Sequence, residues 1–499
     1  MKIIETDKVK PTSLKPIERE WVYNGLDCCV TMEVLDALLP QLDNLTAATY
    51  SFSRSLQGPV LEMGLRGVRV DLARKAEVID DLYEKLDRLE RQLDRIVLDG
   101  CGMRTFNWRS NPDLHLLFYT RLGIPPIKRK GRPTVDRKAL EKLANYLIAR
   151  PIVNHIALMR EIGKKIGVLK TEIDPDIRIR TTYNIAGTET GRFSSSFSEF
   201  GTGTNLQNVE ESIRPIFISD PGKKMAKFDA KSGESYCVGA IEWNLFKDGR
   251  YLDACESGDP HTATARICWP GLPWTGDLKR DKEIAEQPFY RHYSYRFMCK
   301  KIGHGSNYRG APATLAEQAQ IERRVIEQFQ PKYFLAYPAH LRWHGWVEKQ
   351  VHDFGWLISL SGRKRWFFGR RADDSTIREA IAYDPQCSLA DIVNNGMLQV
   401  WQAGIVELYM QDHDAITVQY PEEQEDEIIP RVFKLLSYPV ELAHGRTLTI
   451  PYDCKVGWNR GDYDGKTNPD GLRDYRPGDE RRRTPPVPIL DRSVHRAYG

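Results

Sequence analysis

The chain has 499 residues, with 72 Lys and Arg against 68 Asp and Glu, so its formal net charge is only +4. A chain of this length exceeds what one hydrophobic core usually organises, and we expect two or more subdomains with a cleft between them. The hydrophobic fraction of 41% and the charged fraction of 28% are typical of a soluble globular protein. No apolar stretch reaches the roughly 18 residues of a membrane span. The composition therefore argues against a membrane protein and against a small, strongly basic nucleic-acid-binding module.

The N-terminal residues and the cysteines bear on where the protein acts. The start, MKIIETDKVK, interrupts its few apolar residues with charges and lacks the apolar core of a secretory signal. The nine cysteines form no repeated C-x-x-C pair, and the adjacent Cys28 and Cys29 have no His partner at zinc-finger spacing. An odd, scattered set predicts reduced thiols, so we expect a cytoplasmic protein.

Residues 72–99 predict a long amphipathic helix, because apolar residues from Val78 to Ile96 recur at steps of four and three. Asp71 can cap its start, and Gly100 can end it in a left-handed turn. Shorter helices are expected at 106–124 and 135–147, around the exposed loop KRKGRP. The chain is therefore expected to be mostly helical up to about residue 180.

After this region, short strand-like runs such as IRIRTTYNI and KKMAKFDA mix with helices, which is typical of an α+β fold. Residues 313–350 return to helical patterning, and residues 405–420 hold two apolar-rich runs around a polar tip, which predicts a β-hairpin. Residues 460–499 are rich in Pro, Gly, Asp and Arg, with too little apolar content to fold alone. We expect a mobile or draped tail there.

Four basic clusters could supply local positive charge to an otherwise balanced chain. Two of them also contain aromatic residues, a combination that suits nucleic acid, although each cluster alone also fits a solvated surface. The clusters are KRKGRP, GKKIGVLK, RHYSYRFMCKK and GRKRWFFGRR.

Two carboxylates stand where strands are predicted to end. Asp229 closes the run KKMAKFDA, and Glu234 follows five residues later at the start of a predicted helix. Asp412 and Asp414 flank His413 at the tip of the hairpin. Taken singly, these residues also fit a helix cap and a polar turn. As a pair they suit phosphoryl transfer with two cations about 3.5 to 4 Å apart, which needs bridging anionic oxygens of the kind Mg²⁺ prefers.

A stripe of two cations and two rings is predicted along one helix face, because four residues recur at every fourth position: Arg296, Lys300, His304 and Tyr308. Gly303 and Gly305 lie within this helix, where each costs about 1 kcal/mol relative to alanine, so they indicate close approach by another group. Arg and Lys can meet a triphosphate and a ring can stack on a base, although a solvated basic face also fits the stripe.

A turn-rich loop, TETGRFSSS followed by NLQN, places Arg192 among hydroxyl and amide side chains. Such groups contact phosphates and sugars without reading base sequence. Alone, the loop predicts nothing more specific.

Taken in order, these elements resemble the A-family DNA polymerases, the group of bacterial DNA polymerase I and many phage replicative enzymes. The resemblance covers about residues 180–460, and more weakly 51–180. It is carried, in the family's order, by TGRFSS, NLQN, D-x-x-x-x-E, DPHTATA, R-x-x-x-K-x-x-x-H-G-x-x-Y, SGRKR, Gln386 with Asp391, and HD.

The resemblance implies a right-hand polymerase fold of α+β class, with a helical thumb, an antiparallel-sheet palm carrying the catalytic carboxylates, and helical fingers. The implied regions are an exonuclease-like remnant at 1–50, a thumb at 51–180, a palm at 181–260 and 355–459, fingers at 261–354, and the tail at 460–499.

The resemblance also implies the chemistry. Asp229 and Asp414, with the backbone carbonyl of Ala230, would bind two Mg²⁺ ions, which Mn²⁺ can replace. The primer 3′-hydroxyl would then attack the α-phosphate of a dNTP. Arg296, Lys300 and His261 would bind the phosphates, with Lys300 also donating a proton to pyrophosphate.

Further roles follow from the same resemblance. Tyr308 would pack by the nascent base pair with His304 nearby, and would hydrogen-bond Glu234, the steric gate against a ribose 2′-hydroxyl. The expected partners are primed DNA and dNTPs, with no membrane, in the host cytoplasm if the chain is phage-encoded. The residues expected to contact primer or template are Arg192, Asn205, Gln207, Arg363, Gln386 and His413.

Some positions depart from the family pattern. The ring at His304 is usually Phe or Tyr, and the acidic residue that often follows the HD pair is Ala415 here, whereas Asp412 precedes the pair and could compete as a ligand. Tyr23 and Asp27 resemble the last motif of the 3′-5′ exonuclease domain. Only 22 residues precede Tyr23. We therefore expect no proofreading by this chain alone, with a separate exonuclease chain or other replication proteins as candidate partners.

Two other functions remain open at this point. A single-subunit RNA polymerase shares the palm and the R-x-x-x-K helix but lacks the bulky gate, so Glu234 favours deoxynucleotides. A catalytically inactive DNA-binding replication accessory is the alternative from another class, and the intact set of Asp229, Asp414, Arg296 and Lys300 argues against it.

Overall fold

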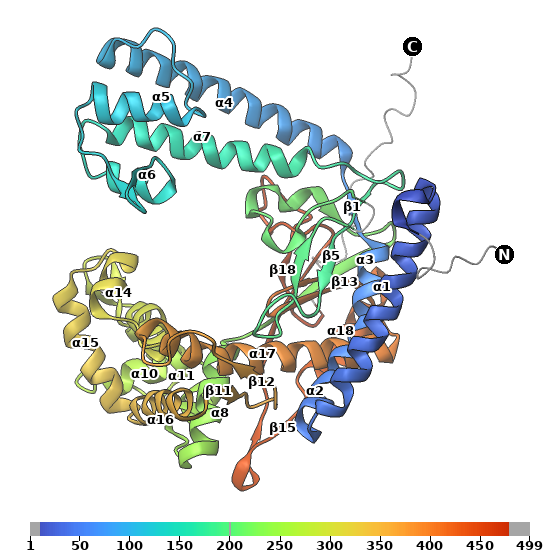
Figure 1. The fold of residues 1–499 in the computed structure, drawn as a ribbon. Coiled ribbons are helices and arrows are strands. Elements are labelled where there is room, and N and C mark those ends of the chain that lie inside the picture. Colours follow the sequence, from blue (N-terminus) through green and yellow to red (C-terminus); the bar gives the residue numbers. More distant parts are fainter. Residues whose placement is uncertain (1–9, 199–200, 479–499) are drawn as a thin grey trace. The chain divides into compact units, whose positions relative to one another are not determined.

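The structure is a computed structural model, and it describes residues 10–198 and 201–478 (Figure 1). The chain forms two compact units, each built from two separate stretches of sequence. Unit 1 comprises Met1–Gln57 and Glu234–Ser388, and unit 2 comprises Gly58–Gly233 and Leu389–Gly499. No helix in the described part of the chain is long and apolar enough to cross a membrane.

Unit 2 is built on a five-stranded sheet with the order β13-β14-β8-β17-β18, in which every neighbouring pair is antiparallel. Two small sheets accompany it, β4-β1-β7 and β5-β6. The strands named here are β1 (Val68–Val70), β4 (Arg178–Ile179), β5 (Thr182–Asn184), β6 (Ser194–Ser196), β7 (Phe217–Ile218), β8 (Lys223–Ala230), β13 (Glu407–Asp412), β14 (Ala415–Pro421), β17 (Tyr452–Gly457) and β18 (Arg473–Asp474).

The central strand β8 packs on both of its faces, and its apolar residues Met225, Ala226 and Phe228 are buried. Met225 belongs to the main core of the unit, whereas the ring of Phe228 packs edge-on against Phe433 of α18 (Glu425–Leu436), with ring centroids 5.2 Å apart. The predicted strand KKMAKFDA and the predicted hairpin at 405–420 are both confirmed, as β8 and as β13 with β14. The pairing of β14 with both β8 and β13 fixes the positions of their ends relative to one another.

The helical part of unit 2 follows the sequence prediction closely. The long helix α4 (Leu72–Cys101) packs against α7 (Arg150–Leu169) through the predicted apolar stripe, of which Leu82, Leu86 and Leu93 are buried. Val97, one residue beyond the predicted stripe, is buried as well. The other elements of this part are α3 (Gln57–Arg66), α5 (Asn111–His115), the π-helix η3 (Leu116–Arg121), the exposed hairpin of β2 (Lys128–Arg129) and β3 (Arg132–Pro133), and α6 (Arg137–Leu143).

The ends of α4 confirm one prediction and correct another. The Asp71 carboxylate accepts a hydrogen bond from the Arg74 backbone N–H and caps the start, as predicted. Gly100 does not end the helix. The helix runs on to Cys101, and Gly102 takes the left-handed conformation with φ of 64°. Gly100 and Gly102 both follow the last apolar residue of the predicted stripe, and the periodicity does not indicate which of them ends the helix.

The segment predicted as a tail begins as part of the folded unit. β18 extends the sheet beside β17, and Arg460, Asn468 and Leu472 are buried. Arg460 donates to Asp412 of the hairpin at 2.7 Å. Residues 460–474 therefore lie against unit 2 through backbone pairing and polar contacts, which fits the draped rather than the mobile alternative. The part at 479–499 lies outside the described residues.

Unit 1 is mostly helical. Its elements are α1 (Pro16–Leu38), α2 (Asn44–Ser55), α8 (Gly233–Phe246), α9 (Arg250–Glu256), α10 (Pro260–Cys268), α11 (Leu278–Ala285), β9 (Pro288–Tyr290), β10 (Tyr293–Ser294), α12 (Tyr295–Phe297), the π-helix η6 (Met298–Gly303), α13 (His304–Asn307), α14 (Pro312–Ala319), α15 (Arg323–Ala336), α16 (Ala339–Phe354), β11 (Trp356–Ile358) and β12 (Lys364–Trp366). The helix α17 (Asp374–Ala403) continues from unit 1 into unit 2.

The two units do not follow the predicted regional boundaries. Helix α8 and the segment 234–260, which we predicted within the palm, belong to the same unit as 261–354, and so do α1 and α2. Tyr23 and Asp27 both lie exposed on α1.

Candidate active site

Asp229 lies near the C-terminal end of β8, the strand between β14 and β17. It lies opposite Ala415 of β14 on one side and opposite Asp453 of β17 on the other. Its side chain is 55% exposed, and the Lys227 ammonium lies 3.3 Å from Oδ2. Because residues paired across strands share a face, Asp229 and Asp453 project from the same side of the sheet. Asp229 is thus a solvent-accessible carboxylate on a rigid strand.

The hairpin brings Asp414 next to this position. His413 adopts a left-handed conformation with φ of 55° and turns the chain between β13 and β14. The Asp414 carbonyl then accepts a hydrogen bond from the Ala230 N–H at 3.1 Å. The backbone of one predicted ligand therefore contacts the residue that follows the other, although 184 residues separate Ala230 from Asp414 in sequence.

A pocket of about 280 Å³ opens beside these strand ends. Three of its carboxylates, Asp229, Asp412 and Asp453, come from three strands of the sheet. Its cations include Lys227, Lys455 and Arg460. The pocket therefore mixes acidic and basic groups, which suits a site that holds cations and phosphates together.

Asp412, the competing candidate, is held by an ion pair. Its Oδ2 lies 2.7 Å from Nη2 of Arg460, whose side chain is 4% exposed. Its Oδ1 is buried and makes no hydrogen bond within the described structure. One oxygen of Asp412 is therefore engaged by Arg460, while the other has unmet acceptor capacity beside the pocket.

The donor set fits a hard cation. Asp229 and Asp414 offer carboxylate oxygens and Ala230 a backbone carbonyl, which are the oxygen ligands that Mg²⁺ prefers. Across residues 10–198 and 201–478, no three His, Cys, Asp or Glu side chains gather closely enough to hold a metal ion by themselves.

Two of the loop residues predicted to contact DNA, Gln207 and Asn205, make hydrogen bonds within unit 2. The Gln207 amide, 7% exposed, donates to the Gln411 carbonyl at 3.2 Å and to its Oε1 at 2.8 Å. The Asn205 Oδ1 accepts from Ser195 Oγ at 2.6 Å and from the Asn208 N–H at 3.2 Å. These contacts give both residues a structural role. Arg192 is half-buried in the same unit, and His413 is exposed at the hairpin turn.

In unit 1, Arg296 is oriented by an aspartate that sequence reasoning missed. Its Nε donates to Oδ2 of Asp259 at 2.8 Å. Asp259 also caps α10 by accepting from the N–H groups of His261 and Thr262. Burial alone would raise the pKa of Asp259, but the hydrogen bond and charge of Arg296 outweigh it and hold the pKa below its usual value. The Asp-Pro pair before His261 was a capping signal that could have found it.

His261 and Lys300 differ in their expected charge. Burial, together with the positive charge of Arg296, lowers the pKa of His261 to about 4, so its imidazole is neutral at neutral pH. Lys300 is exposed on η6. The two side chains would therefore meet an anion differently, one as a neutral hydrogen-bonding group and the other as a full charge.

The predicted helix is not a regular α-helix, because residues 298–303 form a π-helical turn. The two glycines inside it are explained by packing within the unit. A Cβ on Gly303 would lie 3.0 Å from the Tyr333 ring, and a Cβ on Gly305 would lie 2.4 Å from a Leu315 methyl. Close approach was predicted correctly, but side chains of α14 and α15 make it.

Glu234 and Tyr308 are hydrogen-bonded, as the resemblance implied. The Tyr308 hydroxyl donates to Oε2 of Glu234 at 2.5 Å, and the ring of His304 lies edge-on to Tyr308 with centroids 5.1 Å apart. Burial and the neighbouring Glu234 carboxylate raise the pKa of Tyr308 well above its usual value, so the hydroxyl stays protonated. The hydrogen bond therefore holds the Glu234 side chain in one position at the start of α8.

Gln386 and Arg363, the remaining predicted DNA contacts, also lie in unit 1. Gln386 is half-buried on α17. Arg363 follows the turn before β12, where its N–H donates to Ser359 Oγ at 3.0 Å and its carbonyl accepts from the Tyr383 hydroxyl at 2.7 Å. The backbone around Arg363 is thus fixed by side chains on both sides.

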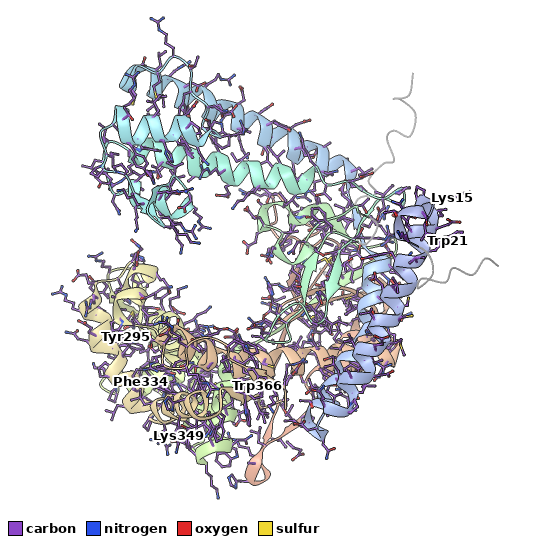
Figure 2. All side chains as sticks on the ribbon, viewed as in Figure 1. Lys15, Trp21, Tyr295, Phe334, Lys349 and Trp366 are labelled. Atoms are coloured by element: carbon purple, nitrogen blue, oxygen red, sulfur yellow. The ribbon has the colours of Figure 1, made fainter. Side chains whose placement is uncertain are left out.

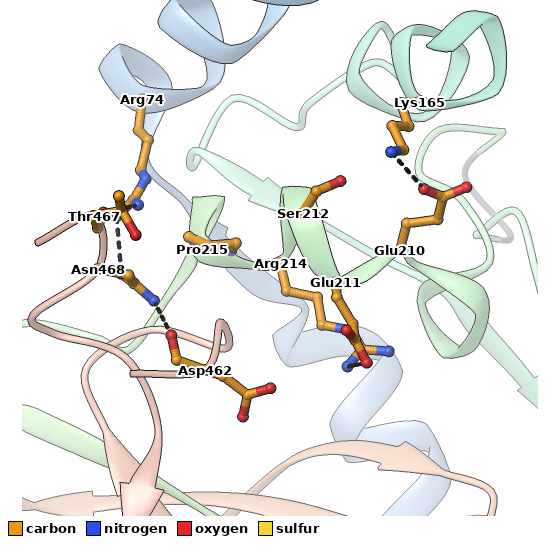
Figure 3. Close-up of a pocket in the computed structure, with 10 residues that line it drawn as sticks. All are labelled: Arg74, Lys165, Glu210, Glu211, Ser212, Arg214, Pro215, Asp462, Thr467 and Asn468. Carbon is orange, nitrogen blue, oxygen red and sulfur yellow. Dashed lines mark hydrogen bonds and ion pairs between the residues drawn. The ribbon is translucent and has the colours of Figure 1, made fainter. Parts of the chain in front are cut away.

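A second pocket in unit 2, of about 820 Å³, is internally neutralised (Figure 3). Lys165 pairs with Glu210 at 3.0 Å, and Arg74 donates to Oδ1 of Asn468 at 3.1 Å. Arg214 lies 3.9 Å from Glu211. Its cations are engaged by neighbouring groups, and we assign this pocket no ligand.

Comparisons with known proteins agree with this architecture. The chain is 26% identical over 475 residues to DNA polymerase I of Pseudomonas aeruginosa, covering 88% of this chain and 47% of that protein. It is 25% identical over 440 residues to the thermostable DNA polymerase I of Thermus aquaticus, covering 81% of this chain and 47% of that protein. The chain thus spans about half the length of these relatives.

A solved structure shares the fold. The POL domain of Pol1 from M. smegmatis, in complex with DNA primer-template and dNTP, matches with a TM-score of 0.65 at 23% identity, covering 82% of this chain and 69% of that one. The antiparallel sheet with carboxylates at its strand ends and the accompanying helices are those of a right-hand polymerase fold. The model of DNA polymerase family A matches residues 74–463, and the chain belongs to that family.

Proposed function

We propose that the chain is a template-directed DNA polymerase, which adds dNMP to a primer 3′-hydroxyl and releases pyrophosphate. The observation that carries the proposal is the β8–β14 ladder, which places Asp414 against Ala230 and so beside Asp229. Membership of DNA polymerase family A supports it. Primed DNA and dNTPs are the proposed partners, by analogy with the contents of the M. smegmatis complex.

Asp229, Asp414 and the Ala230 carbonyl are the proposed ligands of two Mg²⁺ ions, which Mn²⁺ can replace. When bound, such ions acidify the attacking hydroxyl and neutralise charge on the phosphates. The backbone around both proposed carboxylate ligands is fixed by the sheet. Asp229 is on a strand paired on both sides, and the hairpin turn fixes Asp414.

The phosphate-binding group is proposed to be Arg296, His261 and Lys300. Asp259 aims the Arg296 guanidinium, so less side-chain freedom is lost on binding a triphosphate. A neutral His261 donates one hydrogen bond without adding charge. Lys300, which is exposed, is proposed to supply a proton to the leaving pyrophosphate.

The Glu234–Tyr308 pair supports selection of deoxynucleotides over ribonucleotides. A carboxylate held by a buried hydroxyl occupies fixed space and leaves no freedom to admit a 2′-hydroxyl. This feature favours a DNA polymerase over a single-subunit RNA polymerase. The residues proposed to contact primer or template are Arg192, Asn205, Gln207, Arg363, Gln386 and His413. Gln207 also supports the hairpin through its hydrogen bonds to Gln411.

Primer extension with Mg²⁺ tests the proposal. We expect Asp229→Asn to lower the extension rate at least 1,000-fold, because a metal ligand is lost. Asp453→Asn is the matched control, since it removes the same charge from the same pocket and is expected to lower the rate less than tenfold. Equal effects of the two variants, or unchanged extension by Asp229→Asn, would reject the catalytic role and favour a DNA-binding accessory. A mismatched primer end in the same assay reports any excision.

A further inference from the structure

The second half of unit 1 contains a concentration of positive charge. Residues 349–371 hold six Lys and Arg against a single Asp, which gives a net charge of +5 within 23 residues, compared with +4 for the whole chain. The end of α16 and the β11–β12 hairpin make up this stretch. Such a segment attracts a polyanion, because counterions leave the polyanion when Lys and Arg replace them.

Aromatic rings on the same stretch are connected and exposed. The ring centroids of Phe354 and Trp356 are 5.8 Å apart, and those of Trp356 and Trp366 are 6.3 Å apart. Lys364 lies over both indoles, at 4.6 Å and 5.2 Å. Phe354 and Trp366 are each 49% exposed and Phe368 is 93% exposed. Trp366 is labelled in Figure 2.

Burial differs between neighbouring side chains along β12 and the two residues that follow it, and separates an inner from an outer set. Phe367 is buried at 6% exposure and meets Tyr383 edge-on, while Arg365 stacks over Phe367 and pairs with Glu379. Lys364 and Trp366 share the other side of β12, as the period of two in a strand requires, and Phe368 is exposed just beyond the strand. The outer rings are therefore not needed by the core of the unit.

We propose that this outer set, the aromatic–basic face formed by Phe354, Trp356, Lys364, Trp366 and Phe368, binds single-stranded nucleic acid. Exposed rings stack on unpaired bases of any sequence, and the neighbouring cations contact the phosphates. Paired bases hide their faces within the duplex, so the rings favour a single strand. The strand would be the unpaired template under the proposed function, and the face lies outside the proposed metal-binding and phosphate-binding groups.

Equilibrium binding of a fluorescein-labelled 16-nucleotide oligo(dT) to the full chain tests the proposal. We expect Trp366→Ala and Phe368→Ala each to weaken binding about tenfold, the size of one lost base–ring stack. Trp366→Phe, which keeps a stacking ring, is expected to restore most of the affinity. Trp21→Ala is the matched control, because Trp21 is 55% exposed on α1 of the same unit and is expected to leave binding unchanged (Figure 2).

The outcomes separate this proposal from the catalytic one. Asp229→Asn is expected to abolish extension and to leave oligo(dT) binding intact. Unchanged binding by Trp366→Ala and Phe368→Ala, in variants that melt at the wild-type temperature, would overturn the proposal even if extension is normal. Tighter binding of the face to phosphatidylglycerol vesicles than to oligo(dT), lost in Trp366→Ala, would overturn it in favour of a lipid surface.

Discussion

Substitutions at Glu234 and at Tyr308 are expected to affect the choice between dNTP and rNTP to different extents, because the two side chains are hydrogen-bonded. We expect Glu234→Ala to lower the preference for dNTP over rNTP roughly 10- to 100-fold, because the space that excludes a 2′-hydroxyl is vacated. Tyr308→Phe keeps the Glu234 side chain and removes only the hydrogen bond, so its effect is expected to be smaller. Incorporation of matched dNTP and rNTP on one primed template measures both preferences.

An unchanged preference in Glu234→Ala would show that another group excludes the ribose. A larger loss in Tyr308→Phe than in Glu234→Ala would instead show that the tyrosine ring position matters most. Either result would leave the metal-binding proposal for Asp229 untouched.

At the scale of elements, the two glycines at the end of α4 predict opposite effects on stability. Gly102 has φ of 64°, so Gly102→Ala is expected to destabilise the fold by about 1 kcal/mol. Gly100 lies inside the helix, and a Cβ there would meet nothing within 4 Å. Gly100→Ala is therefore expected to stabilise by up to about 1 kcal/mol. Urea unfolding measures both, and destabilisation by Gly100→Ala would contradict the helix boundary.

The strand and helix elements carrying the site were largely predictable from sequence. The end of β8 at Ala230, the hairpin around His413 and the start of α8 beside Glu234 all follow local pattern. The π-helical turn at 298–303 and the role of β18 were not predicted. The first depends on packing of Tyr333 against Gly303, and the second on pairing with β17, neither of which leaves a periodic signal.

For the molecule as a whole, the stability of unit 1 is expected to depend on buried neutral histidine. His344 is 6% exposed, its Nε2 lies 2.7 Å from the Asn307 carbonyl, and burial lowers its pKa to about 4. In the unfolded chain its pKa is near 6.5, so between pH 6.5 and 4 the unfolded state binds more protons. Stability therefore falls as the pH falls through this window.

The size of this effect is bounded by the pKa shift of His344. Wild type is expected to lose up to about 3 kcal/mol relative to His344→Gln between pH 6.5 and pH 4, since Gln keeps a donor for Asn307 without titrating. Denaturant unfolding of both proteins across this range measures the difference. A constant difference at every pH would show that His344 is not the titrating group.

The sequence by itself determined the family, the order of the motifs and the residue types of the proposed chemistry, because these depend on local spacing. Only the tertiary structure decided that Asp414 contacts Ala230 across the β8–β14 ladder, that Asp259 holds Arg296, and that Arg460 engages Asp412. Each of these contacts joins residues that are 37 to 184 positions apart. Contacts over such distances depend on strand register and packing, which no single segment of the chain encodes.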